Sequence, residues 1–140
     1  MRFDAPVDRI TKLTINPHAL LPASSGGPIQ PAAAPGAVVS YVGTEPATTT
    51  FSVRRPATGR LQGGRCAPPS QANLGHKHCT RYVVVGSFKH RDRAGTNQFR
   101  FTGRVHGHKL SSGSYRLSAV PHNSGGAGRA VFVSFSVKSG

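Results

Sequence analysis

Residues 81–105 read RYVVVGSFKHRDRAGTNQFRFTGRV, two runs rich in β-branched and aromatic residues that flank a charged turn. Two similar runs follow, SYRLSAV (114–120) and AVFVSFSV (130–137), each preceded by a turn that carries Gly and Ser. Alternation of apolar and polar residues in such runs is typical of strands with one buried face. Short strands at this spacing indicate an all-β fold, an antiparallel β-sandwich.

The same alternation predicts which side chains enter the core. We expect the run RYVVVGSF, the most apolar in the chain, to be a well-buried strand. In the later runs Arg100 and Arg116 fall at outward positions. The predicted inward residues are Phe99, Phe101, Tyr115, Leu117, Ala119, Val133, Phe135 and Val137.

Three earlier runs complete the predicted sandwich. The run ITKLTI (10–15) is typical of an edge strand, although Ile10 is out of phase with the later apolar residues. AVVSYVGT (37–44) and ATTTFSVRR (47–55) also alternate, and we expect them to form a hairpin that turns around residues 44–47. The total is about seven strands, the number in an immunoglobulin-like sandwich. No helix of three turns fits any part of the sequence.

At 140 residues the chain has room for one domain. We expect residues 1–9 to form a disordered N-terminal tail and residues 10–140 to form the sandwich. Residues 17–36 are rich in Pro and Gly and predict a crossing loop, or else a linker that precedes the folded unit. Residues 55–79 are also rich in Gly and Pro and lack a period, so we expect a second, longer loop.

Cys66 and Cys79 lie within this second loop. A disulfide between them would close a loop of about 14 residues and contribute roughly 3 kcal/mol in the chain-entropy model. It would also point to an oxidising compartment. Zinc is an alternative because His76 and His78 add imidazole donors, but the paired spacing typical of zinc sites is missing. Two free thiols are the third possibility, and we predict the disulfide.

A second pair of histidines, His106 and His108, would point to one side of an extended segment. Two imidazoles could form at most a weak metal site or a pH-sensitive patch. Gly103 and Gly107 favour a turn, so we expect solvated histidines there. We predict no metal and no cofactor for the chain.

Positive charge is the second strong feature of the sequence. The chain has a net charge of +14, and from Leu61 onward twelve Lys and Arg face a single acid, Asp92. Such a field attracts polyanions in a salt-dependent way, although it could also serve only to keep the domain soluble. The candidate anion-binding residues, whose outward positions could merge into a positive sheet face, are Arg81, Lys89, Arg91, Arg93, Arg100, Arg104, Lys109 and Arg116.

The predicted inward position of the phenylalanines leaves this face without rings on which bases could stack. That arrangement favours nonspecific contact with anions over the reading of a nucleic-acid sequence.

Catalysis is disfavoured by the residues present. The chain has four carboxylates and lacks the G-x-S-x-G, H-E-x-x-H and paired-acid motifs of common hydrolases. General acid/base chemistry by two positioned carboxylates is therefore not expected, and we predict that the protein is not an enzyme.

Three stretches carry a resemblance to a known family: RCAPPSQANLGHKHCTRYVVVGSF (65–88), AGTNQFRFTGRV (94–105) and KLSSGSYRLSAVPHNSGGAG (109–128). Together they resemble the immunoglobulin-like or fibronectin-III-like modules of large secreted and surface proteins of actinobacteria. The positions that match the family pattern are Cys66, Cys79, Asn97, Phe101, Gly103, Gly113, Tyr115 and Leu117. Ser112 stands where the pattern has Pro, and the turn 122–128 lacks its usual Asp.

The resemblance implies a noncatalytic structural or adhesive module of a larger secreted or cell-envelope protein. The alternative is a basic protein whose positive sheet face contacts nucleic acid or an anionic cell-wall polymer. Other protein modules are further candidate partners. The sequence holds no apolar stretch of the ~18–20 residues that would cross a bilayer. Its first residues, MRFDAPVDRI, do not form a secretory signal.

Overall fold

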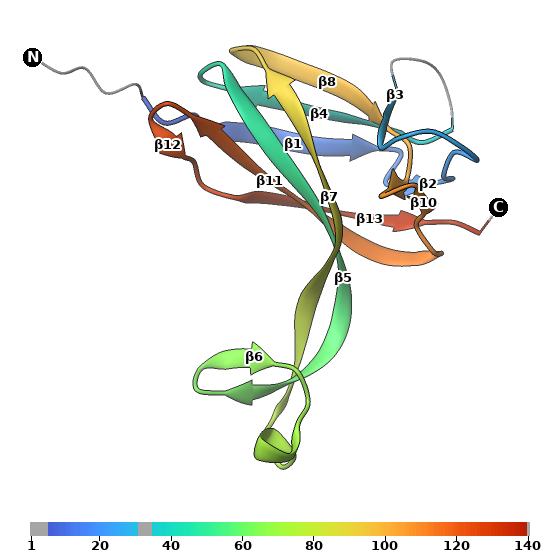
Figure 1. The fold of residues 1–140 in the computed structure, drawn as a ribbon, viewed down its shortest axis with the longest axis vertical. Helices are drawn as coiled ribbons and strands as arrows, with labels where there is room; N and C mark the ends of the chain where they lie inside the picture. The colour runs from blue at the N-terminus through green and yellow to red at the C-terminus, as the bar shows by residue number, and fades with distance from the viewer. Residues whose placement is uncertain (1–5, 31–34, 140) are drawn as a thin grey trace, which may run out of the picture.

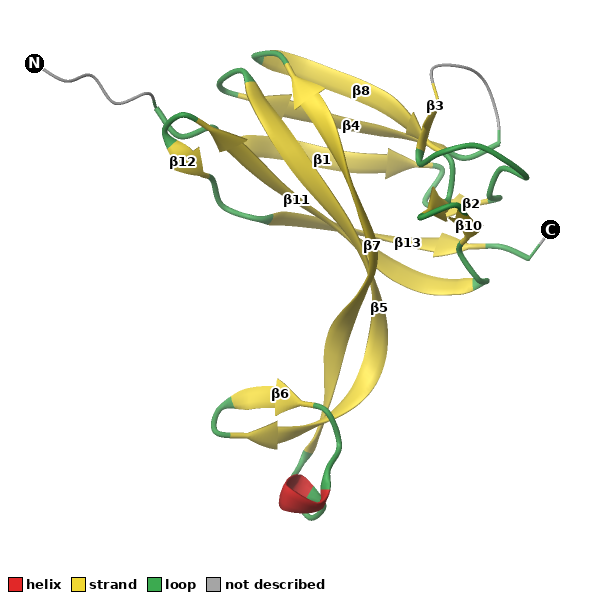
Figure 2. Cartoon of the chain, viewed as in Figure 1, coloured by secondary structure: helices red, strands yellow, loops and turns green. Residues whose placement is uncertain are grey.

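A computed structural model describes residues 6–30 and 35–139 and has an all-β fold. Two β-sheets pack face to face to form a sandwich, which we call the body, and a long two-stranded arm projects away from it (Figure 1). The described residues contain one short 3-10 helix, Gln71–Asn73, at the tip of this arm (Figure 2). None of the helices described is long and apolar enough to cross a membrane.

Seven strands of seven or more residues build the described structure, as the alternating runs predict. They are β1 (Ile10–Asn16), β4 (Ala37–Gly43), β5 (Ala47–Gln62), β7 (His78–Asp92), β8 (Gly95–Phe101), β11 (Gly113–Asn123) and β13 (Val131–Val137). Six shorter strands supplement them: β2 (Ala19–Leu20), β3 (Ile29–Gln30), β6 (Arg65–Ala67), β9 (Arg104–Val105), β10 (His108–Lys109) and β12 (Gly126–Ala127).

The long strands are divided between the two sheets. One sheet has the order β1-β4-β8-β3, and the other has the order β2-β13-β11-β5, with β7 and β6 also paired to β5. All pairs of long strands are antiparallel, while β2 joins β13 in parallel. We call the first the small sheet and the second the large sheet.

The predicted hairpin of residues 37–44 and 47–55 is wrong. β4 pairs with β1 and β8, whereas β5 pairs with β11 and β7, so the connection around Glu45 crosses from one sheet to the other. Both strands alternate in the way that was predicted, and this pattern cannot tell whether two successive strands share a sheet.

The first strand explains why Ile10 is out of phase. Lys12 has a φ of 57°, and the pairing of β1 with β4 shifts in register between Thr11 and Thr14. This bulge turns Ile10 inward, so that Ile10 and Ile15 are both buried.

The crossing stretch 17–36 contributes two short edge pairings. Ser136 lies opposite Ala19 and Val137 opposite Leu20, while Ile29 lies opposite Phe101. Residues 31–34 of this stretch lie outside the described residues.

The core lies between the two sheets and is rich in aromatic rings. Phe51 stacks on Phe88 at 5.3 Å, Phe88 stacks on Phe101 at 5.4 Å, and Tyr115 stacks on Phe135 at 5.5 Å. The predicted inward residues of the last three runs are buried or packed against this cluster, which confirms the alternation there.

Residues 55–79, predicted to be a loop, belong largely to strands. The pairing of β11 with β5 ends at Arg54, and beyond it β5 continues with β7 as its partner. We call residues 55–83 the arm. Its strands run from Arg55 opposite Val83 to Arg60 opposite His78.

The prediction that RYVVVGSF is a well-buried strand holds only for its last residues. Gly86 and Phe88 are buried in the body, but Tyr82 and Val84 are 38% and 49% exposed at the root of the arm. A second sheet covers β7 only after the chain has entered the sandwich.

The body begins before the predicted boundary at residue 10. Asp8 is 1% exposed, and its Oδ1 accepts hydrogen bonds of 2.9 Å from the backbone N–H groups of Thr44 and Glu45. Asp8 therefore fixes the crossing between the sheets. Residues 1–5 of the predicted tail lie outside the described residues.

Candidate functional site

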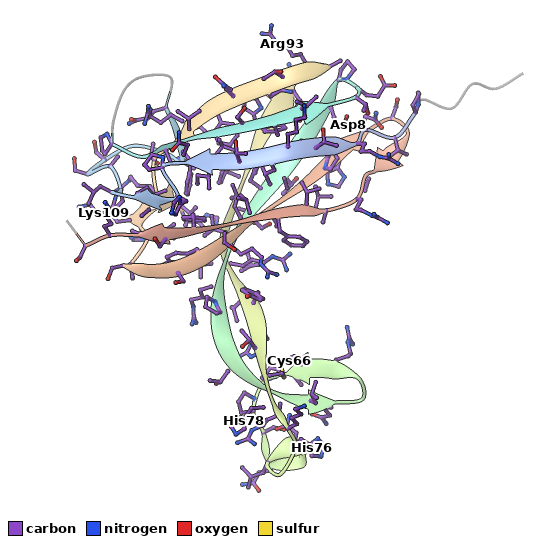
Figure 3. All side chains as sticks on the ribbon, turned by 180° about the vertical axis from the view of Figure 1, so that it is seen from behind. Asp8, Cys66, His76, His78, Arg93 and Lys109 are labelled. Carbon is purple, nitrogen blue, oxygen red and sulfur yellow. A yellow bond between two sulfur atoms is a disulfide. The ribbon has the colours of Figure 1, made fainter. Side chains whose placement is uncertain are left out.

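The eight cations predicted to bind anions do not form one face. Arg100 lies on β8 of the small sheet, while Lys89, Arg91 and Arg116 lie on the large sheet, at positions that alternate with buried residues. The turn residue Arg93 and Lys109 of β10 lie at opposite ends of the body (Figure 3). These residues are separated because β7 and β11 belong to the large sheet, whereas β8 lies between them in sequence and belongs to the small sheet.

Arg104 has a structural role. Its Nε donates to the carbonyl of Gly26 at 2.8 Å, and its Nη2 donates to the carbonyl of Gly107 at 2.8 Å. A longer contact of 3.4 Å joins Nη1 to the carbonyl of Ala23. Arg104 thus holds the crossing stretch against the β9–β10 hairpin, and much of its donor capacity is used there.

Arg81, the last of the eight predicted cations, lies in the arm. The arm carries five Lys and Arg and no Asp or Glu. Arg55, Arg65 and Lys77 are exposed, whereas Arg60 and Arg81 each donate to a backbone carbonyl of the arm. A projecting element of one sign of charge is a candidate surface for anions.

The disulfide between Cys66 and Cys79 is present, as predicted, and it fastens the arm. Cys66 lies on β6 and Cys79 on β7, and both strands pair with β5, so the bridge passes over the strand between them. Gly59 of β5 lies beneath it. A Cβ atom there would collide with the Sγ of Cys66 and lie 2.9 Å from the carbonyl oxygen of Ala67. The bridge therefore requires glycine at position 59.

The end of the arm is ordered by Asn73, which is fully buried although it lies far from the core. Its side-chain amide donates to the Oε1 of Gln62 at 2.8 Å and to the carbonyl of Pro68 at 3.0 Å. Its Oδ1 accepts the backbone N–H of Ser70 at 2.9 Å. Sequence reasoning missed this role, because an Asn in a Gly- and Pro-rich stretch reads as an ordinary turn residue.

The zinc alternative conflicts with this arrangement. Both sulfur atoms are used in the disulfide, so neither cysteine is a thiolate ligand. The ring of His76 makes a contact of 2.6 Å with the carbonyl oxygen of Leu61, and His78 lies on β7 (Figure 3). The described residues contain no group of three or more His, Cys, Asp or Glu side chains that could hold a metal ion.

The second histidine pair lies in the β9–β10 hairpin. His106 has a φ of 51° and forms part of the turn, and His106 and His108 are both exposed. The segment is not extended through both residues, which removes the basis for expecting their rings to share one side.

Two carboxylates of the body, those of Asp8 and Asp92, are buried. Asp92 accepts hydrogen bonds from the hydroxyls of Tyr41 and Thr49, and the Nδ1 of His90 lies 2.7 Å from its Oδ1. Burial, and then the hydrogen bond to Asp92, raise the pKa of Tyr41 well above its usual value. The network joins β4 of the small sheet to β5 and β7 of the large one.

The root of the arm holds a second feature that sequence reasoning missed. Two aromatic rings are exposed there, those of Tyr82 and Phe132, and the guanidinium carbon of Arg116 lies 3.9 Å and 5.3 Å from their centres. The expectation that the positive face lacks exposed rings is therefore wrong. Phe132 sits at an outward position of β13, and Tyr82 is exposed because the arm leaves the sandwich.

Comparison with known proteins does not assign the chain to a family. No protein-family model matches this chain, and no curated protein matches it.

Proposed function

We propose that the chain is a noncatalytic, immunoglobulin-like module of a secreted or cell-envelope protein, and that its arm contacts an anionic polymer of the envelope. The main support for this proposal is the presence of the arm. A module that served only as a spacer would not need a projecting, positively charged element that is fastened by its own disulfide.

The strand arrangement supports the immunoglobulin-like assignment. The long strands β1, β4 and β8 face the long strands β13, β11, β5 and β7, a division of three against four. The hydroxyl of Tyr115, near the start of β11, donates to the carbonyl of Ser111 at 2.6 Å. A tyrosine bonded to the backbone a few residues upstream is a hallmark of such sandwiches. One difference is that β7 pairs with β5, whereas the fourth strand of an immunoglobulin constant domain pairs in the other sheet.

The disulfide supports an extracellular or envelope location. Disulfides persist in oxidising environments and are rare in the reducing cytosol. Here the bridge lies in the arm, outside the aromatic core, so its principal effect is on the element that we propose to be functional.

The rigidity of the arm supports a binding role. Ordering a loop on binding reduces the affinity, and a preformed element avoids much of that cost. The disulfide over Gly59 and the hydrogen bonds of Asn73 hold the end of the arm in one shape before any partner arrives. Its exposed cations are thus presented without a disorder-to-order transition.

Elution from immobilised heparin, used as a generic polyanion, tests the proposal. The arm variant Arg55→Ser/Arg65→Ser/Lys77→Ser removes three exposed cations. The control Lys89→Ser/Arg91→Ser/Arg93→Ser removes the same charge from exposed positions of the body. We expect the arm variant to elute at much lower salt than the control, because contact with the polymer is made by the arm.

Equal shifts for the two triple variants would show that retention follows net charge alone, and would overturn the role of the arm. Failure of the unmodified protein to bind heparin or purified wall polymer at physiological salt would overturn the adhesive function itself.

Nucleic acid is the second candidate partner, favoured by the exposed rings of Tyr82 and Phe132. Aromatic side chains beside cations are used by proteins that bind single strands. A single-stranded oligonucleotide that competes with heparin at physiological salt, and loses affinity when Tyr82 is replaced by Ser, would support it.

A further inference from the structure

A groove of about 380 Å³ lies at the root of the arm. This volume is within the range of roughly 300–1,000 Å³ that is common for small-ligand sites. The groove is formed by segments far apart in the sequence: the stretch after β1, the start of the arm, and strands β11 and β13. The lining residues that matter here are His18, Pro56, Tyr82, Ser114, Ser134 and Ser136.

Arg116 provides a fixed positive charge beside this groove. On β11 it lies two residues from Ser114, and its cross-strand partner on β13 is Ser134, so both neighbours line the groove. The contacts of its guanidinium with the rings of Tyr82 and Phe132 hold it on the outer face of the sheet.

Arg54 adds a second guanidinium directly opposite Arg116 on the neighbouring strand. Like charges in such a cross-strand pair repel each other and destabilise the sheet. Among the described residues the single ion pair is that of His90 with Asp92, so neither arginine has a carboxylate partner there. In addition, the Nε of Arg54 is buried with no hydrogen-bond partner in the described structure. An anionic group at this point would relieve the repulsion.

The other walls of the groove fit a sugar. Serine hydroxyls donate and accept hydrogen bonds, as sugar hydroxyls require, and three of them line one groove. The exposed ring of Tyr82 offers a flat apolar surface for the C–H face of a pyranose.

We propose that the root groove binds a sugar residue that carries a carboxylate, as one unit of an acidic polysaccharide. The carboxylate pairs with Arg116 and Arg54, the ring of the sugar packs on Tyr82, and the serines bond its hydroxyls. The proposal rests on the proposed function, because it names the class of anionic polymer and the place where a single unit is recognised. The arm supplies charge, and the groove supplies selectivity for a sugar ring.

Titration calorimetry on the complete chain at physiological salt tests this. The probes are oligomers of galacturonate, mannuronate and hyaluronate, with methyl-esterified galacturonate oligomers as the uncharged control and inorganic polyphosphate as a charged polymer without rings. We expect at least one acidic oligosaccharide to bind. For it, Arg116→Gln and Tyr82→Ser should each lower the affinity about tenfold or more, the former because a charge-assisted hydrogen bond is lost.

Arg91→Gln is the matched control, because it removes the same charge from an exposed position of the same sheet away from the groove. It should change the affinity for the acidic oligosaccharide less than about twofold. For polyphosphate, Arg116→Gln and Arg91→Gln should have equal, small effects. Esterification of the galacturonate carboxylates should abolish the dependence on Arg116.

Other outcomes overturn the proposal in distinguishable ways. If none of the acidic oligosaccharides binds while heparin retention still depends on the arm, the groove is not the site and the proposed function stands. The same conclusion follows if the ester binds as well as the acid. Tyr82-dependent binding of single-stranded DNA in preference to all three oligosaccharides would assign the rings to nucleic acid. A concentration-dependent dimer that loses its self-association in Tyr82→Ser would assign the groove to a second copy of the chain.

Discussion

The inner halves of β5 and β7 lie in the body and their outer halves form the arm, so one pair of strands can be compared in two environments. In the body Phe51 lies opposite Phe88, and both are buried against the small sheet. In the arm no second sheet covers the pair. There Pro56 lies opposite Tyr82, and both residues are exposed.

The two halves are consequently stabilised by different interactions. The body relies on apolar burial, with aromatic rings stacked between two sheets and its acids Asp8 and Asp92 bonded inside. The arm relies on a disulfide, the backbone ladder and the amide of Asn73. A change in one half should therefore leave the other half largely intact, which can be tested by measuring the stability of each half separately.

Removal of a core ring should have the largest effect. Phe51→Ala deletes a fully buried ring that contacts Tyr41, Phe88 and Phe99, and should destabilise the body by about 3–5 kcal/mol. The matched control Phe132→Ala removes the same ring from a position that is 49% exposed and should change stability by less than about 1 kcal/mol. Urea unfolding monitored by circular dichroism measures both. Equal losses would show that the aromatic cluster is not what holds the sheets together.

Loss of the disulfide should affect the arm alone. Gly59→Ala places a methyl group against the Sγ of Cys66, so we expect two titratable thiols in place of the bridge and faster hydrogen exchange in residues 55–83. The local cost is up to about 3 kcal/mol, the chain-entropy value for a loop of this length. Gly75→Ala is the control, because nothing lies within 4 Å of a Cβ there. Body amides that also exchange faster would show that the two halves are coupled.

The sequence predicts the structure of the body better than that of the arm. The alternation of apolar and polar residues predicts the inward residues of the body, including Phe101 and Leu117. It does so because every second side chain of a strand points to the same face, whichever sheet the strand joins. It cannot distinguish a strand covered by a second sheet from one that leaves the sandwich. It therefore predicts that the whole run RYVVVGSF (81–88) is well buried, whereas Tyr82 and Val84 are exposed. Which sheet receives a strand is decided by long-range packing, as the crossing at Glu45 shows.

The candidate site was predictable only in part. The spacing of Cys66 and Cys79 and the excess of cations are visible along the chain. The need for Gly59 beneath the bridge appears only once β5 is known to pair with both β6 and β7. The root groove brings together His18, Tyr82 and Ser134. These residues lie far apart in the sequence, so no local sequence pattern predicts that they are close in space.

A rise in pH should have the smallest of the expected effects, and it should lower the stability of the body but not that of the arm. The folded body raises the pKa of Tyr41 above its unfolded value of about 10, so the folded state keeps a proton that the unfolded chain loses. The stabilising contribution is complete below about pH 10 and declines as the pH rises further, because ionisation then favours the unfolded state. Burial raises the pKa of Tyr115 in the same direction.

We therefore expect the urea midpoint of the body to fall between pH 8 and pH 11, and Tyr41→Phe to reduce that fall. At pH 8 the same substitution should cost about 1–3 kcal/mol, because Asp92 is buried and loses a donor. The disulfide-fastened arm contains no buried tyrosine, so its hydrogen exchange, corrected for the intrinsic effect of pH, should not follow the change. If the urea midpoint of Tyr41→Phe fell with pH as much as that of the unmodified protein, ionisation of Tyr41 would not be the cause of the loss of stability at high pH.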